Sequence, residues 1–252
     1  MPGFRKSCGS MVAVLTFATG IASAPVSAQD VPVDLELVLA TDVSASIDLD
    51  EASLQRDGYI AALTDAAVID AIRFGFLGRI AVVYVEWAGA QRTIVDWTII
   101  EDSTGAHAFV DALRSAPRTS GASTSISGAL DYAATLFQGN GFNGSRRVID
   151  ISGDGRNQAG RPLRFARADT LADGVTINAL PLLFYDADGR ELNPGLDRYY
   201  LEHVVGGPGA FALPARGLGA FPEAIRKKLI IEISGVAPPI SVARATERNT
   251  RK

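Results

Sequence analysis

Short apolar runs alternate with amphipathic stretches along most of the chain. The apolar runs cover residues 34–41, 79–87, 92–100, 146–152 and 175–184. Runs of this length that are apolar at most positions are typical of strands buried on both faces of a sheet. Between them, helical spacing of apolar residues covers 48–62, 65–73, 103–115, 124–138, 162–173 and 220–233.

This alternation predicts one α/β domain, with a doubly wound, mostly parallel central sheet and helices on both faces. The runs 79–87 and 92–100 are separated by only four residues, which indicates a hairpin and one antiparallel edge strand. The segment between 184 and 220 is rich in glycine and proline, and we expect it to be largely irregular. We expect the domain to cover residues 29–235.

Both ends of the chain differ from this pattern. A basic start and an apolar stretch at 11–21 precede small residues that end at Ala28. This order predicts a signal peptide over 1–28, and therefore an exported protein, periplasmic or secreted. Residues 236–252 are basic and have no apolar periodicity, so we expect a solvated, disordered tail.

The composition argues against several classes of partner and site. The chain has 24 Lys+Arg and 28 Asp+Glu, a net charge of −4, so we expect no nucleic-acid partner. The single cysteine, Cys8, lies in the predicted signal peptide, which leaves neither a disulfide nor a thiolate metal site in the mature protein. No later segment has about 18 consecutive apolar residues, and we expect no membrane insertion.

Polar side chains follow two of the predicted strands at the point where each strand ends. Asp42, Ser44 and Ser46 follow the run 34–41, and Asp154 follows the run 146–152. In a doubly wound sheet, ligands bind beyond the carboxyl ends of the strands where the strand order reverses. The two aspartates would converge there if their strands are neighbours.

A third polar segment, residues 120–125, opens a predicted helix and contains Thr124. Asp-Val-Ser-Ala-Ser, a Gly-x-x-Thr helix entry and a strand ending in Asp-Gly together resemble the metal-ion-dependent adhesion site of von Willebrand factor type A domains. The resemblance covers most of residues 34–233 in element order. The stretches VEW, VIDISGDG, INALP and VVGGPGAF further resemble an uncharacterised bacterial group of exported proteins with such a domain.

The resemblance implies a Rossmann-like fold that binds Mg²⁺ or Mn²⁺ and performs no catalysis. The implied metal ligands are Asp42, Ser44, Ser46, Thr124 and Asp154. It also implies that the ion accepts one more oxygen, from an Asp or Glu of a protein partner.

The sequence departs from the family pattern at two places. Gly153 stands before the last aspartate, where the family usually has Thr or Ser, and Ser152 lies one position earlier. The threonine segment is rich in serine, so Ser123 or Ser125 remains an alternative ligand to Thr124.

The chemistry of the donor set favours the same kind of ion. Small hard cations such as Mg²⁺ prefer oxygen ligands, and three hydroxyls with two carboxylates provide them. Two carboxylates do not overcompensate a divalent charge, so the ion can still attract an anionic oxygen. The ligands that zinc prefers are scarce, because the chain has two histidines and only Cys8.

Two other functions remain open. A Mg²⁺-dependent phosphotransferase or hydrolase of the haloacid-dehalogenase type also places an aspartate after its first strand. That chemistry needs a second aspartate two positions later, where this chain has Ser44. The other alternative is a structural von Willebrand A-type domain whose site binds no metal.

Further candidate residues have structural interpretations. His107 and His203 are accompanied by no nucleophile motif, so we expect structural or surface roles. Asp150 lies inside a predicted strand, and we expect it to pair with Arg146 or Arg147 or to support the metal site. The two tryptophans are expected to pack at the hairpin edge, with an exposed partner anchor as the alternative.

Overall fold

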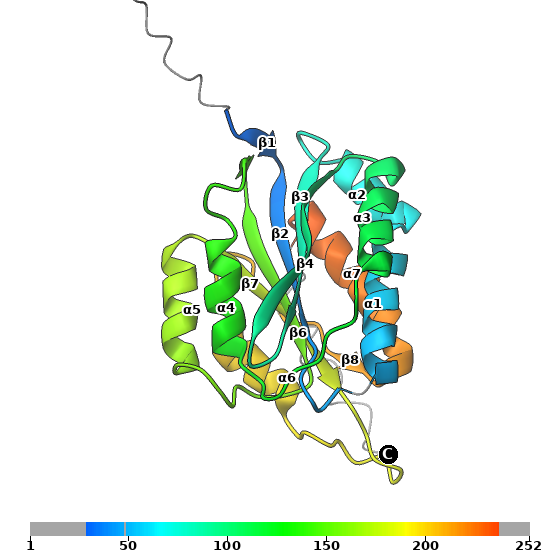
Figure 1. Cartoon of the computed structure of the whole chain (residues 1–252), viewed down its shortest axis with the longest axis vertical. Coiled ribbons are helices and arrows are strands. Elements are labelled where there is room, and N and C mark those ends of the chain that lie inside the picture. The colour runs from blue at the N-terminus through cyan, green and yellow to red at the C-terminus, as the bar shows by residue number, and fades with distance from the viewer. Residues whose placement is uncertain (1–28, 48, 237–252) are drawn as a thin grey trace, which may run out of the picture.

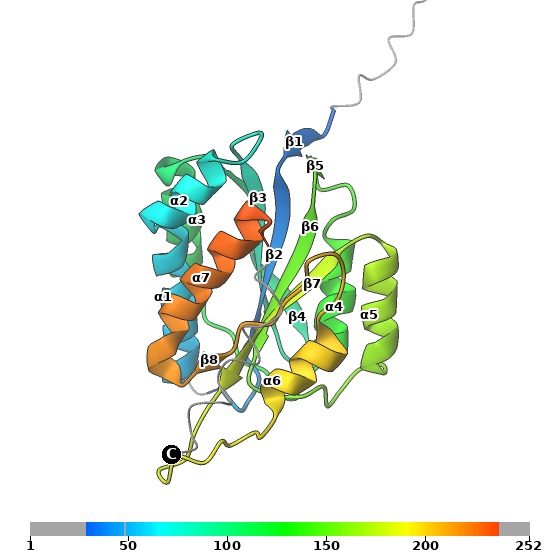
Figure 2. The ribbon, with the colours of Figure 1, turned by 180° about the vertical axis from the view of Figure 1, so that it is seen from behind.

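The structure is a computed structural model that describes residues 29–47 and 49–236. A twisted central sheet is covered by helices on both faces (Figure 1), and Figure 2 shows the same layers from behind. The predicted signal peptide over 1–28, Asp48 at the predicted helix start and residues 237–252 of the predicted tail lie outside the described residues.

The central sheet has six strands, five of which run parallel. In spatial order they are β4 (Gln91–Ile100), β3 (Ile80–Trp87), β2 (Leu35–Asp42), β6 (Arg147–Gly153), β7 (Thr176–Leu183) and β8 (Ala215–Arg216). Only β4 is antiparallel to its neighbour, and it lies at the edge. The predicted fold class is therefore confirmed. The short strands β1 (Val31–Val33) and β5 (Phe142–Gly144) form a separate parallel pair.

The helices divide between the two faces of the sheet. One face is covered by α1 (Leu49–Leu63), α2 (Ala66–Arg73), α3 (Ser103–Ser115) and α7 (Phe221–Ser234). The other face is covered by α4 (Ile126–Thr135), α5 (Leu163–Ala172) and α6 (Leu196–Tyr199). None of the helices within 29–47 and 49–236 is long and apolar enough to cross a membrane.

Each face of the sheet has its own hydrophobic core. Along β2, Leu37 and Leu39 pack on the α1, α2, α3 and α7 side, whereas Val38 and Ala40 pack on the side of α4, α5 and α6. This alternation follows from the two-residue period of a strand. By the same period, Asp42 at the end of β2 faces the α4–α6 side.

The region between β7 and α7 is more ordered than its sequence suggests. A helical segment begins at Leu196 and continues as a π-helical turn over Tyr200–Val204, and β8 and a 3₁₀ turn (Leu218–Ala220) follow. The prediction of a largely irregular segment was therefore wrong at 196–204. The helix buries only Leu196, Tyr200 and Val204, a pattern too short to be distinguished from a loop in a sequence rich in Gly and Pro.

A charged cluster lies inside the core between β6 and α7. Asp150 pairs with Lys228 of α7 at 2.6 Å, and Lys228 also pairs with Glu232 one turn later. All three side chains are almost fully buried. Asn178 of β7 donates a hydrogen bond of 2.9 Å to Glu232.

The predicted pairing of Asp150 with Arg146 or Arg147 was wrong. Arg146 instead donates to the carbonyl oxygens of Glu232 and Ile233 at the end of α7, and Arg147 donates to the carbonyl of Asp173. Arg146 precedes β6 and Arg147 is its first residue, whereas Asp150 lies deeper in the sheet and faces α7. Burial and the nearby Asp150 raise the pKa of Glu232 to about 8.

Candidate metal centre

Asp42 is the last residue of β2 and has no exposed surface. Its Oδ1 accepts a hydrogen bond of 2.8 Å from the backbone N–H of Ser44, which shapes the turn after the strand. Its Oδ2 is buried and has no hydrogen-bond partner among the described residues. A buried carboxylate oxygen normally has a donor or a cation next to it, so Oδ2 is a candidate ligand atom.

The loop after β2 contacts the loop after β6. Ser46 Oγ donates a hydrogen bond of 2.8 Å to Asp154 Oδ1, and Ser44 Oγ lies 3.2 Å from Ser46 Oγ. These contacts are possible because β2 and β6 are parallel neighbours, so their carboxyl ends meet at the same edge. The strand order reverses here, since β2 pairs with β3 on its other side.

Thr124 reaches this group of oxygens from a third loop. Its Oγ1 donates to Ser44 Oγ at 3.3 Å, and the side chain is buried. The backbone carbonyl of Thr124 accepts hydrogen bonds from the N–H groups of Gln158 and Ala159, which join this loop to the loop of Asp154. Side-chain contacts therefore link Thr124, Ser44, Ser46 and Asp154. Asp42, the fifth predicted site residue, joins them through the backbone N–H of Ser44.

Close backbone contacts bring the Thr124 loop to the sheet. Gly121 N–H donates to the carbonyl of Val43 at 3.0 Å, and Gly89 N–H donates to the carbonyl of Ala122 at 2.9 Å. A Cβ on Gly89 would lie 2.7 Å from that carbonyl oxygen, so only glycine permits the approach. Ser123 adopts a left-handed backbone conformation with φ 67°, a strain that a tightly held loop can sustain.

A buried ion pair holds the beginning of the same loop. Arg56 of α1 pairs with Glu86 of β3, and Thr119 donates a hydrogen bond to the same carboxylate. Arg56 also donates to the backbone carbonyl of Ala116 at 2.8 Å. The chain from 116 to 119 is thereby attached to two core elements before it reaches Thr124.

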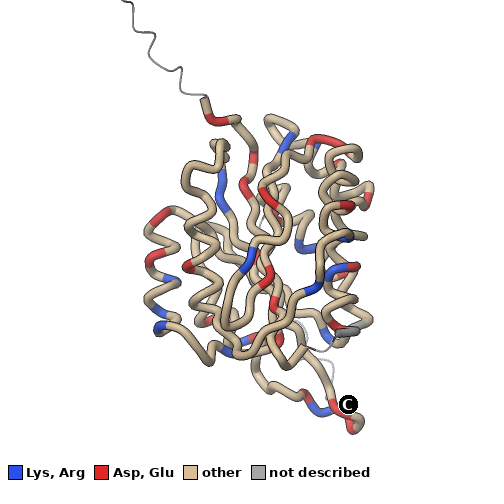
Figure 3. Tube along the Cα trace, viewed as in Figure 1, with Lys and Arg blue, Asp and Glu red and all other residues tan. Residues whose placement is uncertain are grey.

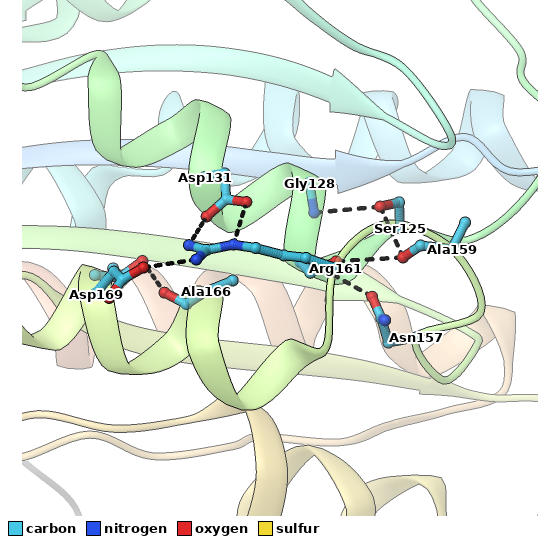
Figure 4. Close-up of polar contacts among 10 residues, drawn as sticks. Ser125, Gly128, Asp131, Asn157, Ala159, Arg161, Ala166 and Asp169 are labelled. Carbon is cyan, nitrogen blue, oxygen red and sulfur yellow. Dashed lines mark hydrogen bonds and ion pairs between the residues drawn. The ribbon is translucent and has the colours of Figure 1, made fainter.

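The serines that flank Thr124 have other roles. Ser125 Oγ accepts a hydrogen bond from Gly128 N–H at 3.2 Å and donates to the carbonyl of Ala159 at 3.1 Å, so it caps α4 (Figure 4). Ser123 is exposed. Of the three candidates, Thr124 alone has a hydrogen bond to the other predicted ligands.

An arginine outside the site joins the two helices next to it. Arg161 pairs with Asp131 of α4 at 2.5 Å and with Asp169 of α5 at 2.6 Å (Figure 4). Both pairs are partly exposed, so each contributes little to stability. Arg161 ends the loop that begins at Asp154, and its contacts fix where that loop returns to α5.

Gly153 has no side chain at the position before Asp154, where the family usually has Thr or Ser. Ser152, one position earlier, does not supply the missing hydroxyl to the site. Ser152 Oγ accepts a hydrogen bond of 3.4 Å from Tyr59 of α1, which places it on the opposite face of the sheet from Asp42. Sequence reasoning missed Asn193, whose side-chain amide donates a hydrogen bond to the backbone carbonyl of Asp154 at 3.0 Å. That contact depends on a loop 39 residues away.

The electrostatics of the site favour a bound cation. Burial, and to a lesser extent the nearby Asp154, raise the pKa of Asp42 to about 7. Burial also raises the pKa of Asp154 above its usual range. Two desolvated carboxylates that share a site are stabilised in their ionised forms by a positive charge between them.

The donor set fits a hard divalent cation. Two carboxylates and three hydroxyls are oxygen ligands of the kind that Mg²⁺ and Mn²⁺ bind. Among residues 29–47 and 49–236, no three His, Cys, Asp or Glu side chains form a metal-binding group. A site here would therefore depend on its serine and threonine hydroxyls.

The remaining candidates lie away from these oxygens. His107 and His203 are exposed on helical segments. Trp97 packs against Phe137 with ring centroids 5.7 Å apart and donates a hydrogen bond to the Leu136 carbonyl. Trp87 is fully buried in the core beneath the site. Lys and Arg are interspersed with Asp and Glu along the trace (Figure 3).

Comparisons with solved structures identify the fold. Proximal thread matrix protein 1 from the mussel byssus, solved with a zinc-occupied MIDAS motif, superposes with a TM-score of 0.61 at 17% identity, covering 82% of this chain and 50% of that chain. The pilus adhesin SpaC from Lactobacillus rhamnosus GG has a TM-score of 0.58 at 13% identity, covering 81% of this chain and 30% of that chain.

A von Willebrand factor type A structure from Catenulispora acidiphila has a TM-score of 0.55 at 13% identity, covering 80% of this chain and 43% of that chain. This chain thus spans half or less of the length of these three structures. A search of curated protein sequences finds no match.

A family model described as "Protein of unknown function (DUF1194)" matches residues 32–237. That match includes every strand of the central sheet and all five predicted site residues. The chain belongs to this family and has the von Willebrand factor type A fold.

Proposed function

We propose that this protein is an exported, non-catalytic binding module in which a bound Mg²⁺ or Mn²⁺ coordinates an acidic side chain of another protein. The ion would be held by Asp42, Ser44, Ser46, Thr124 and Asp154. The observation that carries the proposal is the chain of contacts from Thr124 to Ser44, Ser46 and Asp154, at 3.3, 3.2 and 2.8 Å, which joins three loops.

The charge balance of this donor set explains why the partner would present Asp or Glu. Asp42 and Asp154 together neutralise a divalent ion, and the three hydroxyls add oxygen ligands without further negative charge. Mg²⁺ dehydrates reluctantly and keeps several waters, so a carboxylate from a partner has a water to replace. The partner's carboxylate would then be the sixth side chain, and the third carboxylate, to supply an oxygen to the ion.

The same residues argue against turnover. A phosphotransferase of the haloacid-dehalogenase type needs an acid at the position of Ser44 to exchange a proton with the leaving group. Among the described residues, Ser44 Oγ hydrogen-bonds to the hydroxyls of Ser46 and Thr124, and neither is a base. We therefore propose binding without catalysis.

Export follows from the predicted signal peptide at 1–28, and we propose a periplasmic or secreted location. A pilus adhesin is among the proteins of similar fold, which agrees with a role outside the cytoplasm. At such a location the bound metal ion could exchange with divalent ions in the surrounding solution.

Calorimetry of the purified protein with Mg²⁺ and with Mn²⁺ tests the site. We expect saturable binding by the wild type, and none by Asp42→Ala or Asp154→Ala. Asp188→Ala is the matched control, because this acid is exposed in a surface turn and lies outside the predicted site. No saturable binding in the wild type would leave the metal-free structural domain as the better account.

A metal-dependent pull-down from an extract of exported proteins tests the partner. A protein retained with Mg²⁺, released by a chelator and absent with Asp42→Ala is the expected result. Generic phosphoester hydrolysis that depends on Mg²⁺ and disappears with Asp42→Ala would instead support the enzymatic alternative.

A further inference from the structure

Gly153 is surrounded by polar side chains rather than by open space. A Cβ built on this glycine would lie 2.7 Å from the hydroxyl oxygen of Tyr200 and 2.8 Å from Asp42 Oδ2. It would also lie 3.1 Å from Cζ2 of Trp87. The volume that a side chain at position 153 would need is therefore already taken, in part by the Tyr200 hydroxyl.

Each of the three side chains around this glycine has a buried polar atom without a hydrogen-bond partner among the described residues. These atoms are Asp42 Oδ2, the Tyr200 hydroxyl and Trp87 Nε1. A carboxylate oxygen accepts, an indole N–H donates, and a tyrosine hydroxyl does both, so the set is complementary. Each would be costly to leave unpaired, which indicates a shared role for the group.

The position of Tyr200 is fixed by an unusual piece of backbone. Tyr200 begins the π-helical turn that ends at Val204, and its carbonyl accepts a hydrogen bond from Val205 N–H at 3.0 Å. The ring has no exposed surface and packs edge-on against Tyr199 at 6.1 Å. Single π turns inside helices occur frequently at functional sites, because they redirect one side chain.

We propose that Tyr200 is a positioning residue for the metal centre. Its hydroxyl lies in the space left by Gly153, beside Asp42 Oδ2, and donates a hydrogen bond to that oxygen through one water, because no direct bond joins the two atoms. This bond orients the carboxylate, whose other oxygen is held by Ser44 N–H. The effect on metal affinity rests on the proposed function, whereas the contact with Asp42 does not.

Removal of the hydroxyl is the first test. Partners that orient a metal ligand typically contribute about 10- to 100-fold to affinity, so Tyr200→Phe should raise the Mg²⁺ dissociation constant by about tenfold or more. Tyr59→Phe is the matched control, because it removes a buried hydroxyl that contacts Ser152 on the other face of the sheet. Its dissociation constant should equal that of the wild type.

Substitution of the glycine tests the same crowded space. Gly153→Ala places a Cβ 2.8 Å from Asp42 Oδ2 and 3.1 Å from Trp87 Cζ2, so it should raise the Mg²⁺ dissociation constant even in the Tyr200→Phe protein. With Tyr200 intact, Gly153→Ser should lower the melting temperature, because its Cβ would lie 2.7 Å from the tyrosine hydroxyl.

A metal-free arm separates this inference from the proposed function. In a chelator, the melting-temperature changes of Tyr200→Phe and Asp42→Asn should be non-additive in the double variant, because the two groups interact. If the wild type binds no Mg²⁺ but the two changes are coupled, the proposed function fails and the contact stands. Additive melting-temperature changes would overturn the inference whether or not the site binds metal. If the site does bind Mg²⁺, a Tyr200→Phe dissociation constant equal to that of the wild type would also overturn it.

Discussion

Ser46 Oγ donates a 2.8 Å hydrogen bond to Asp154 Oδ1 across 108 residues of sequence. The bond joins the loop after β2 to the loop after β6, and it exists because these strands are adjacent and parallel. Both groups lie in loops that follow buried strands within four residues of the strand end. The chemistry of the site therefore depends on rigid elements rather than on the loops alone.

Loss of the Ser46 hydroxyl should weaken metal binding more than folding. Ser46 is exposed, so Ser46→Ala should change the free energy of unfolding by less than about 1 kcal/mol without metal. It removes one proposed ligand and the partner of Asp154, so the Mg²⁺ dissociation constant should rise by about tenfold or more. Calorimetry and denaturant unfolding measure the two effects, with Ser123→Ala as the exposed control. An unchanged dissociation constant would remove Ser46 from the ligand set.

Thr124 and Ser125 should separate into a ligand and a helix cap. Thr124→Val keeps the shape but loses the hydroxyl that contacts Ser44, and it should abolish detectable Mg²⁺ binding. Ser125→Ala should retain binding but lower the free energy of unfolding by about 0.5–2 kcal/mol, because α4 loses its N-cap. The opposite assignment, with binding lost only in Ser125→Ala, would contradict the role of Thr124.

The buried Arg56–Glu86 pair should be important for both stability and the Thr124 loop. Arg56→Met leaves the buried Glu86 carboxylate without its cation, which should cost about 3–5 kcal/mol in the free energy of unfolding. Arg114→Met breaks the exposed pair with Asp111 and should cost less than about 1 kcal/mol. Denaturant unfolding compares the two, and equal small losses would mean that the buried pair does not hold the loop.

Glu232 should make the protein less stable as the pH rises. Its pKa is about 8 in the folded protein, against an ordinary value of 4.5. The folded state therefore holds this proton more tightly, so the stabilisation is complete below pH 4.5 and is lost as the pH rises towards 8. Lys228 and Asn178 oppose the shift, whereas burial and Asp150 cause it.

Unfolding measured between pH 5 and 8 tests this dependence. The difference in free energy of unfolding between wild type and Glu232→Gln should change by at most about 1.4 kcal/mol per pH unit. The pKa of Asp42 is also raised, so Asp42 lowers the free energy of unfolding as the pH rises in both proteins. The difference between the two proteins therefore reports on Glu232 alone. Parallel curves for the two proteins would show that Glu232 is ionised throughout this range.

Much of the fold could be predicted because the strands are long and continuously apolar. The runs that end at Asp42 and before Asp154 could be recognised as buried strands, and the four-residue gap after Trp87 indicated the antiparallel edge. Convergence of the two aspartates needed only that β2 and β6 be neighbours. The sequence allowed this pairing but did not establish it.

Other contacts could not be predicted because they depend on how helices dock. Asp150 pairs with Lys228, and that pairing is set by where α7 crosses β6. Tyr200 lies in a glycine- and proline-rich region with no periodicity, where it begins a π turn and its hydroxyl lies next to Gly153. Residue order contains little information about such contacts when the intervening chain is irregular.

Binding of one divalent cation among the oxygens of three loops can be observed in a crystal of the protein grown with Mn²⁺ and measured at the manganese absorption edge. We predict a single strong anomalous peak within bonding distance of Ser44 Oγ and Ser46 Oγ, absent from crystals of Asp154→Ala. A wild-type map without a peak at these hydroxyls, at millimolar Mn²⁺, would contradict it.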